Sequence, residues 1–62
     1  MPLIEVKALE HRFEDQDKAE QLIARLTEAM VEVYGEAARE QTWVILTGVP
    51  KTKWGFGGQV RS

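Results

Sequence analysis

The chain has 62 residues, of which 44% are hydrophobic and 29% charged, with no cysteine and a formal net charge of -2. This length allows one domain, residues 1–62, and so short a chain buries only about 60% of the surface that its unfolded form exposes. Without cysteine, neither a disulfide nor a thiolate zinc site can add stability, so self-association is the expected remedy. The composition excludes a disordered chain, and the acidic balance argues against a nucleic-acid binder.

Targeting and membrane signals are missing from the sequence. No apolar run approaches the roughly 20 residues that a membrane-spanning helix needs, and no basic segment followed by an apolar core stands at the start of the sequence. The lack of cysteine is compatible with a reducing compartment. We therefore expect a cytoplasmic protein with neither a membrane nor a nucleic-acid partner.

The first predicted element is a strand over Leu3–Leu9, where apolar and charged residues alternate after Ile4. Because this strand starts almost at residue 1, it holds position 2 at a defined place in a sheet, whereas most chain ends fray.

A long amphipathic helix is predicted next, starting at Asp15 or Asp17 and ending at Gly35. Its apolar residues recur at three- and four-residue spacing and form one stripe over about five turns. The stripe consists of Ala19, Leu22, Ile23, Leu26, Ala29, Met30, Val33 and Tyr34.

The apolar run Thr42–Thr47 predicts a second strand, of the kind buried on both faces. Strand, helix and strand form a β-α-β unit, whose right-handed crossover makes the strands parallel. The helix covers one face, and another copy of the chain is expected on the other. The tail, residues 54–60, alternates aromatic residues and glycine before Gly57 and Gly58, which predicts a short hairpin docked on a neighbour. A flexible tail is the alternative.

Pro2 is the main candidate for chemistry. Aminopeptidases remove an initiator methionine that precedes a small residue, which would leave Pro2 with a free secondary amine. An ordinary α-amine titrates at about 7.7–8.0, and an apolar pocket or a nearby cation lowers this value, so that the amine can act as a general base. If Met1 stays attached, the nitrogen is an amide and cannot be a base. On spacing alone, Pro2 is also compatible with the start of an edge strand.

The order of these features resembles the 4-oxalocrotonate tautomerase family over nearly the whole chain. The resemblance rests on Pro2 directly after the initiator, on Arg12 ten residues later, and on the aromatic-Gly-x-Gly-Gly pattern that begins at Trp54. It implies an α+β protein: a β-α-β tautomerase fold with a short C-terminal hairpin, whose parallel two-stranded unit is assembled into larger sheets by oligomerisation. The implied assembly is a homohexamer, a trimer of dimers with sites between subunits, although some members form mixed heterohexamers.

The resemblance also implies a keto-enol tautomerase that needs no metal and no organic cofactor, in a family associated with the degradation of aromatic compounds. Pro2 matches the proline that moves a proton along a conjugated acid. Arg12 matches the arginine of a neighbouring subunit that holds a substrate carboxylate, which suits a guanidinium; without the resemblance we would expect Arg12 to be solvated. Trp54 matches an aromatic wall of the pocket, or packs in the hairpin, and Leu9 would line the same cavity.

Trp43 departs from the family pattern, because the best-known members carry an arginine directly before the second strand's apolar run. That arginine contacts the far carboxylate, and its loss removes a charge-assisted contact of roughly 1.5–3 kcal/mol. A small anionic substrate with one carboxylate, or an aromatic enol such as phenylpyruvate, is therefore expected, with Trp43 as an apolar wall. Arg39 is four residues away and could swing into the site, although it does not match the missing arginine.

The remaining charged residues are given no role: His11 stands where the family has glycine, and the other cations are expected to be solvated. These cations are Lys51, Lys53 and Arg61. Two alternative functions stay open. One is a dehalogenase or hydratase of small unsaturated acids on the same scaffold, which needs a carboxylate to activate water. The other is a non-catalytic subunit whose site a partner chain completes.

Overall fold

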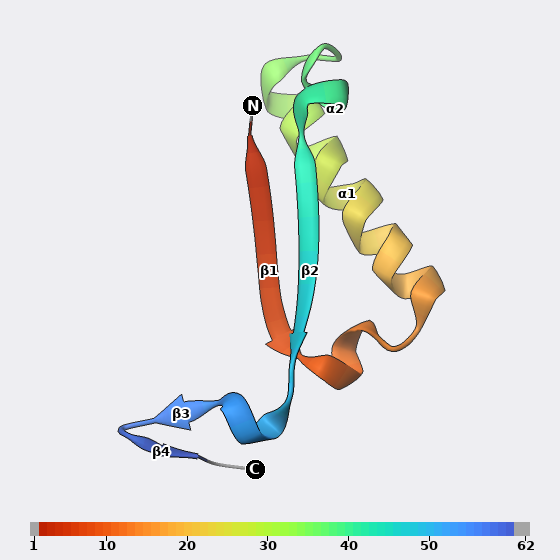
Figure 1. The fold of residues 1–62 in the computed structure, drawn as a ribbon. Helices are drawn as coiled ribbons and strands as arrows, with labels where there is room; N and C mark the ends of the chain where they lie inside the picture. Colours follow the sequence, from red (N-terminus) through yellow and green to blue (C-terminus); the bar gives the residue numbers. More distant parts are fainter. Residues whose placement is uncertain (1, 61–62) are drawn as a thin grey trace.

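The computed structural model of the chain describes residues 2–60. Its main elements are two strands joined by a long helix, and the chain ends in a small hairpin (Figure 1). In chain order the elements are β1 (Leu3–Leu9), η1 (Glu10–Phe13), α1 (Gln16–Tyr34), α2 (Ala38–Gln41), β2 (Trp43–Val49), η2 (Lys51–Lys53), β3 (Gly55–Phe56) and β4 (Gln59–Val60).

β1 and β2 form a parallel pair, in register from Leu3 opposite Trp43 to Leu9 opposite Val49. One further hydrogen bond extends the ladder, since the N–H of Trp43 donates to the carbonyl oxygen of Pro2 over 3.0 Å. The predicted α+β class, the β-α-β unit and the first strand's bounds are confirmed. The second strand runs two residues further than its apolar run, because parallel pairing with β1 continues through Gly48 and Val49.

The long helix has the ends that its sequence predicts. The side chain of Asp15 accepts hydrogen bonds from the backbone N–H groups of Asp17 at 3.0 Å and Lys18 at 3.3 Å, which satisfies two of the free donors of the first turn. Gly35 ends the helix at φ +96°, a conformation that favours glycine. The sequence did not predict α2, the single turn that follows.

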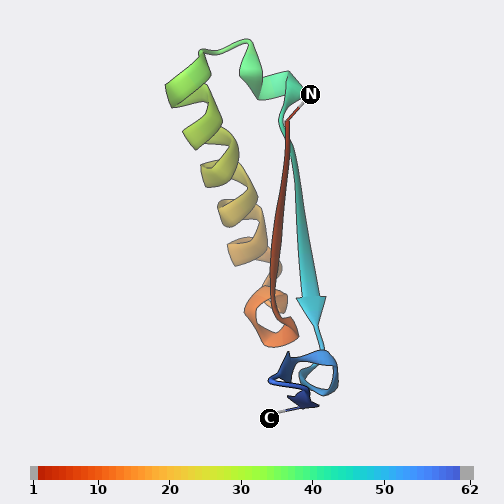
Figure 2. The same ribbon diagram turned by 90° about the vertical axis from the view of Figure 1, so that its left-hand side faces the viewer.

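Only one face of the sheet is covered in the single chain. Figure 2 shows the strand pair nearly edge-on, with α1 along one side. On the other face Leu3 and Trp43 stand side by side, 53% and 56% exposed, with Ile45 beyond them. Among the described residues only the side chain of Ala19, on α1, counts as buried. The expectation that β2 is buried on both faces therefore holds for the helix side alone in this chain.

The dimensions of the chain support the same conclusion. Its accessible surface is 5078 Å², against about 4,100 Å² for a folded protein of 7.1 kDa. Its radius of gyration is 14.4 Å, whereas about 11 Å is typical of a compact chain of this length. A single copy thus leaves much apolar surface in water. None of the helices described is long and apolar enough to cross a membrane.

The predicted hairpin is present. Gly57 and Gly58 turn the chain between β3 and β4 at φ +59° and +87°, and a two-residue turn with two positive φ values needs such residues. Trp54 is held at its base, since its indole N–H donates to the carbonyl oxygen of Val49 over 3.0 Å. The rings of Trp54 and Phe56 stack at a centroid distance of 6.4 Å.

Candidate active site

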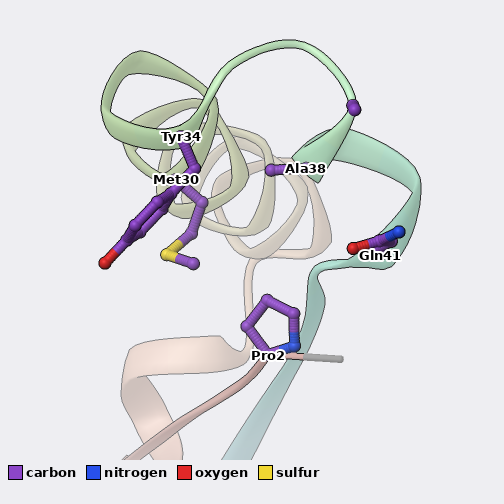
Figure 3. Close-up of a pocket in the computed structure, with 6 residues that line it drawn as sticks. Pro2, Met30, Tyr34, Ala38 and Gln41 are labelled. Carbon is purple, nitrogen blue, oxygen red and sulfur yellow. The ribbon is translucent and has the colours of Figure 1, made fainter.

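A pocket of about 380 Å³ lies beside Pro2, at the amino end of the two strands. Pro2, directly before β1, lies on one side of it, and the last turn of α1 and the short α2 lie on the other (Figure 3). Its lining residues are Pro2, Met30, Tyr34, Ala37, Ala38 and Gln41. Most of these side chains are apolar, so the half-buried Pro2 ring faces a surface with few groups that solvate a charge.

The backbone fixes the position of Pro2. Its carbonyl oxygen accepts the N–H of Trp43, which ties Pro2 to the start of β2. The side chain of Met30 lies over the proline ring, as Figure 3 shows. No histidine, lysine or carboxylate lines this pocket, so a freed nitrogen of Pro2 would be the only amine in its lining.

Arg39, which could have swung toward the site, is held elsewhere by two carboxylates. Its guanidinium binds Glu28 through contacts of 2.8 and 3.0 Å and Glu36 through contacts of 2.7 and 3.2 Å. The hydrogen bonds from Arg39 lower the pKa of both carboxyl groups below the usual 4.5, and the pKa of Arg39 is raised. The guanidinium does not line the Pro2 pocket in this structure; it ties α2 to α1.

Trp43, the expected apolar wall, lies near Pro2 in the backbone but not in the pocket. Its side chain shares the open face of the sheet with Leu3, whereas the pocket lies on the helix side. Trp43 could therefore line an active site only where a second copy of the chain covers the open face of the sheet.

The other three predicted site residues are gathered at the opposite, carboxyl end of the strands. Leu9 is the last residue of β1, and the exposed Arg12 follows in η1. Trp54 lies beyond the end of β2, where its indole N–H is hydrogen-bonded to the carbonyl oxygen of Val49. A second hollow of about 300 Å³ lies at this end. It is lined by Leu9, Glu10, His11, Glu14, Pro50, Lys51 and Thr52.

Close packing fixes η1, which carries Arg12, against β2. A Cβ atom at Gly48 would lie 2.9 Å from the Cα atom of Glu10, a separation that real side chains essentially never show. Gly48 therefore lets the backbone after β1 pass directly over β2.

The two groups of candidate residues cannot meet within one chain. Leu9 lies seven residue steps after Pro2 along an extended strand, a span of roughly 23 Å at about 3.3 Å per residue. One chain thus carries an apolar pocket with Pro2 at one end and the candidate arginine with an aromatic residue at the other.

Sequence reasoning missed the roof of the Pro2 pocket. Met30 and Tyr34 were assigned to the helix stripe that packs on the sheet, and they do lie one turn apart on α1. The stripe runs past the end of the strands, however, so its last turn overhangs the pocket. Gln41 carried no signal, because it belongs to a one-turn helix without a periodic pattern.

Comparison with known proteins identifies the family. The model of the family described as "Tautomerase enzyme" matches residues 2–62. The chain belongs to the tautomerase family. The match starts at Pro2 and includes both ends of the strand pair, and tautomerases as a class are isomerases. No curated protein and no solved structure gives a significant match. Among residues 2–60 no three histidine or acidic side chains of this family member lie close enough together to hold a metal ion.

Proposed function

We propose that this protein is a cofactor-independent keto-enol tautomerase for small unsaturated 2-oxo or 2-hydroxy acids, with the amine of Pro2 as general acid and base. The match to the tautomerase family from residue 2 onward carries the proposal. The apolar pocket beside Pro2 supports it, since that lining contains no other base for the reaction.

The chemistry requires a neutral nitrogen. Loss of Met1 gives Pro2 a secondary amine, and the apolar side chains of Met30, Ala37 and Ala38 favour its neutral form over the ammonium. The neutral amine takes the enol O–H proton, and the released electron pair forms the C=O bond. The C=C pair then takes the same proton from the ammonium at carbon, which yields the keto form and restores the amine.

A neighbouring copy supplies the carboxylate-binding group in this proposal. Arg12 is exposed and lies at the far end of β1, so it cannot reach Pro2 of its own chain. A guanidinium binds a carboxylate through two parallel hydrogen bonds. Leu9 and Trp54, at the same end, would accompany Arg12 and wall the site.

The same reasoning favours an assembly of several copies. The open sheet face with Leu3, Trp43 and Ile45, and the exposed Phe56 of the hairpin, leave apolar surface that association would cover. A homohexamer, as a trimer of dimers, is our proposed state, and a mixed hexamer is the alternative. Native mass spectrometry distinguishes them, because a homohexamer with turnover excludes a subunit that depends on a second chain.

The preferred substrate carries one carboxylate. Trp43 stands where an arginine for a second carboxylate would be needed, and the guanidinium of Arg39 is occupied by Glu28 and Glu36. A monocarboxylate or an aromatic enol such as phenylpyruvate fits these residues better than a dicarboxylate does. Dehalogenation or hydration is less favoured, since no carboxylate lines the Pro2 pocket to activate water.

The decisive experiment replaces Pro2. We expect Pro2→Ala to lower kcat for phenylpyruvate ketonisation by about 100-fold or more, because the primary amine of alanine is not held in place by a ring, and a positioned acid-base group usually contributes about this much. The intact masses of both proteins must lack one methionine, and their circular dichroism and native mass must agree. Unchanged turnover in Pro2→Ala would refute the proposal.

A further inference from the structure

The Pro2 pocket offers a substrate uncharged polar groups. Two of its lining side chains can form hydrogen bonds, the amide of Gln41 and the phenol of Tyr34, and neither forms one within the described chain. The other lining residues provide apolar surface. The lining of this pocket thus offers a substrate two neutral hydrogen-bonding side chains and no lysine, arginine or histidine.

The two arginines considered for this site, Arg39 and Arg12, are not available to it from the same chain. Arg39 belongs to the adjacent α2, but its guanidinium forms ion pairs with Glu28 and Glu36. Arg12 lies at the far end of β1, and in the proposed assembly the copy that reaches this pocket holds the carboxylate. The second substrate oxygen, on which negative charge grows as the proton moves, still needs a donor.

Gln41 is placed to be that donor. The N–H and the hydroxyl of Thr42 both bond to the carbonyl oxygen of Ala38, at 3.0 and 2.8 Å, and fix the end of α2. The next N–H, that of Trp43, bonds to the carbonyl of Pro2. Gln41 thus lies two residues before Trp43, whose N–H is hydrogen-bonded to the carbonyl oxygen of Pro2. Figure 3 shows the amide of Gln41 on the same side of the pocket as α2, above the proline ring.

Tyr34 is the weaker candidate. It is the last residue of α1 and, like Gln41, it is exposed, but its hydroxyl points away from Pro2 in Figure 3. Its ring can cover a bound substrate, but nothing bonded to Pro2 fixes its hydroxyl.

We propose that Gln41 is a catalytic residue, whose side-chain N–H donates a hydrogen bond to the 2-oxo or enolate oxygen of the substrate. The proposal rests on the tautomerase function of Pro2. While Pro2 takes the enol proton, charge grows on that oxygen, and an amide N–H that donates to it stabilises the charged oxygen more than it stabilises the neutral enol. The amide keeps its own protons throughout, so the proton balance stays with Pro2.

The test compares Gln41→Ala and Gln41→Glu with wild type, using the enol of phenylpyruvate as the probe. Gln41→Ala removes the donor, and we expect kcat to fall by about 10- to 100-fold while KM changes by less than about threefold. Gln41→Glu keeps the shape but puts a carboxylate beside the growing oxyanion, so its kcat should fall further. Glu40→Ala, one position earlier on α2, is the matched control and should keep wild-type kcat.

The outcomes separate this inference from the proposed function. Loss of activity in Pro2→Ala together with wild-type kcat in both Gln41 variants overturns the role of Gln41 alone. Equal activity of Pro2→Ala and wild type overturns the proposed function and, with it, the role of Gln41. A loss that appears in KM but not in kcat makes Gln41 a binding residue only and also overturns the proposal. Circular dichroism and native mass confirm that each variant assembles.

Discussion

The two ends of the strand pair differ in chemistry. The amino end holds Pro2 under an apolar roof with neutral polar groups, and the guanidinium of Arg39, on α2, is bound by two carboxylates. The carboxyl end carries Arg12, with Lys51 and Lys53 in η2 and the fixed indole of Trp54. One end thus offers the proposed proton acceptor, and the other offers positive charge and an aromatic surface.

This difference follows from the parallel pairing of β1 and β2. Parallel strands place both amino ends together and both carboxyl ends together, so each chain has two unlike ends. Residues at opposite ends can act on one substrate only if the amino end of one copy meets the carboxyl end of another. A point-group assembly allows such contacts between copies.

The largest effect is expected from mixing two inactive variants. Pro2→Ala and Arg12→Ala should each lower kcat/KM by about 100-fold or more, because one replaces the ring-held secondary amine with a freely rotating primary amine and the other lacks the carboxylate clamp. Co-assembled in equal amounts, they should regain about one quarter of the wild-type activity, since a quarter of the sites would pair an intact Pro2 with an intact Arg12.

Mixing each variant with itself is the control for this experiment. If no activity returns on co-assembly, although native mass spectrometry shows mixed oligomers, the two ends do not share a site between copies.

The second prediction adds charge near the neutral end. We expect Trp43→Arg to raise kcat/KM for an unsaturated 2-oxo dicarboxylate by about 10- to 100-fold relative to that for phenylpyruvate, as a charge-assisted hydrogen bond of about 1.5–3 kcal/mol would. Steady-state kinetics on both compounds measures this ratio. Trp43→Gln, which removes the indole without adding charge, should leave it near the wild-type value; an equal ratio in both variants would show that position 43 does not face the substrate.

The third prediction concerns the close packing of η1, which carries Arg12, against β2. A methyl group at Gly48 would collide with the backbone of Glu10, so Gly48→Ala should lower the free energy of unfolding by about 1–3 kcal/mol. Urea unfolding at one fixed protein concentration measures it. Gly55→Ala is the control, because no atom lies within 4 Å of a Cβ there. Equal midpoints for the two variants would contradict the close approach.

The smallest effect is expected at Arg39. Its hydrogen bonds lower the pKa of Glu28 and Glu36, so they stabilise the fold above about pH 4.5 and stop doing so as the pH falls through the lowered pKa values. Arg39→Gln should lower Tm at pH 7 by less than Gly48→Ala does, because all three groups are exposed. The difference from wild type should vanish in strong acid. Arg25→Gln, an exposed helix arginine, should show no such pH dependence.

Much of the fold could be predicted because its signals are local. Alternation in Leu3–Leu9, the helix stripe between Asp15 and Gly35, and the pair Gly57–Gly58 each specify an element through a few neighbouring residues. The parallel pairing followed from the crossover rule. The one-turn α2 and the two short 3-10 helices have no periodic pattern, and only packing reveals them.

The candidate site was harder to predict than the fold, because its residues are distant in sequence. Pro2 was singled out by its chemistry and its family resemblance, whereas Gln41 approaches it only because the N–H of Trp43 bonds to the carbonyl of Pro2. Arg39 is held away from the Pro2 pocket partly by its ion pair with Glu28, which lies eleven residues earlier on another helix. How copies would meet in the proposed assembly is not encoded in any local pattern of one chain.

The hydrogen bond from the N–H of Trp43 to the carbonyl oxygen of Pro2 also has a practical consequence. It engages the carbonyl of Pro2 and leaves the nitrogen of that residue outside the ladder. A purification tag fused ahead of this nitrogen, even one cut to leave a single extra residue, would keep the sheet intact while turning the amine into an amide. Recombinant protein of that kind would look well folded in spectroscopic assays and, under the proposed mechanism, would be inactive, so affinity tags belong at the other terminus.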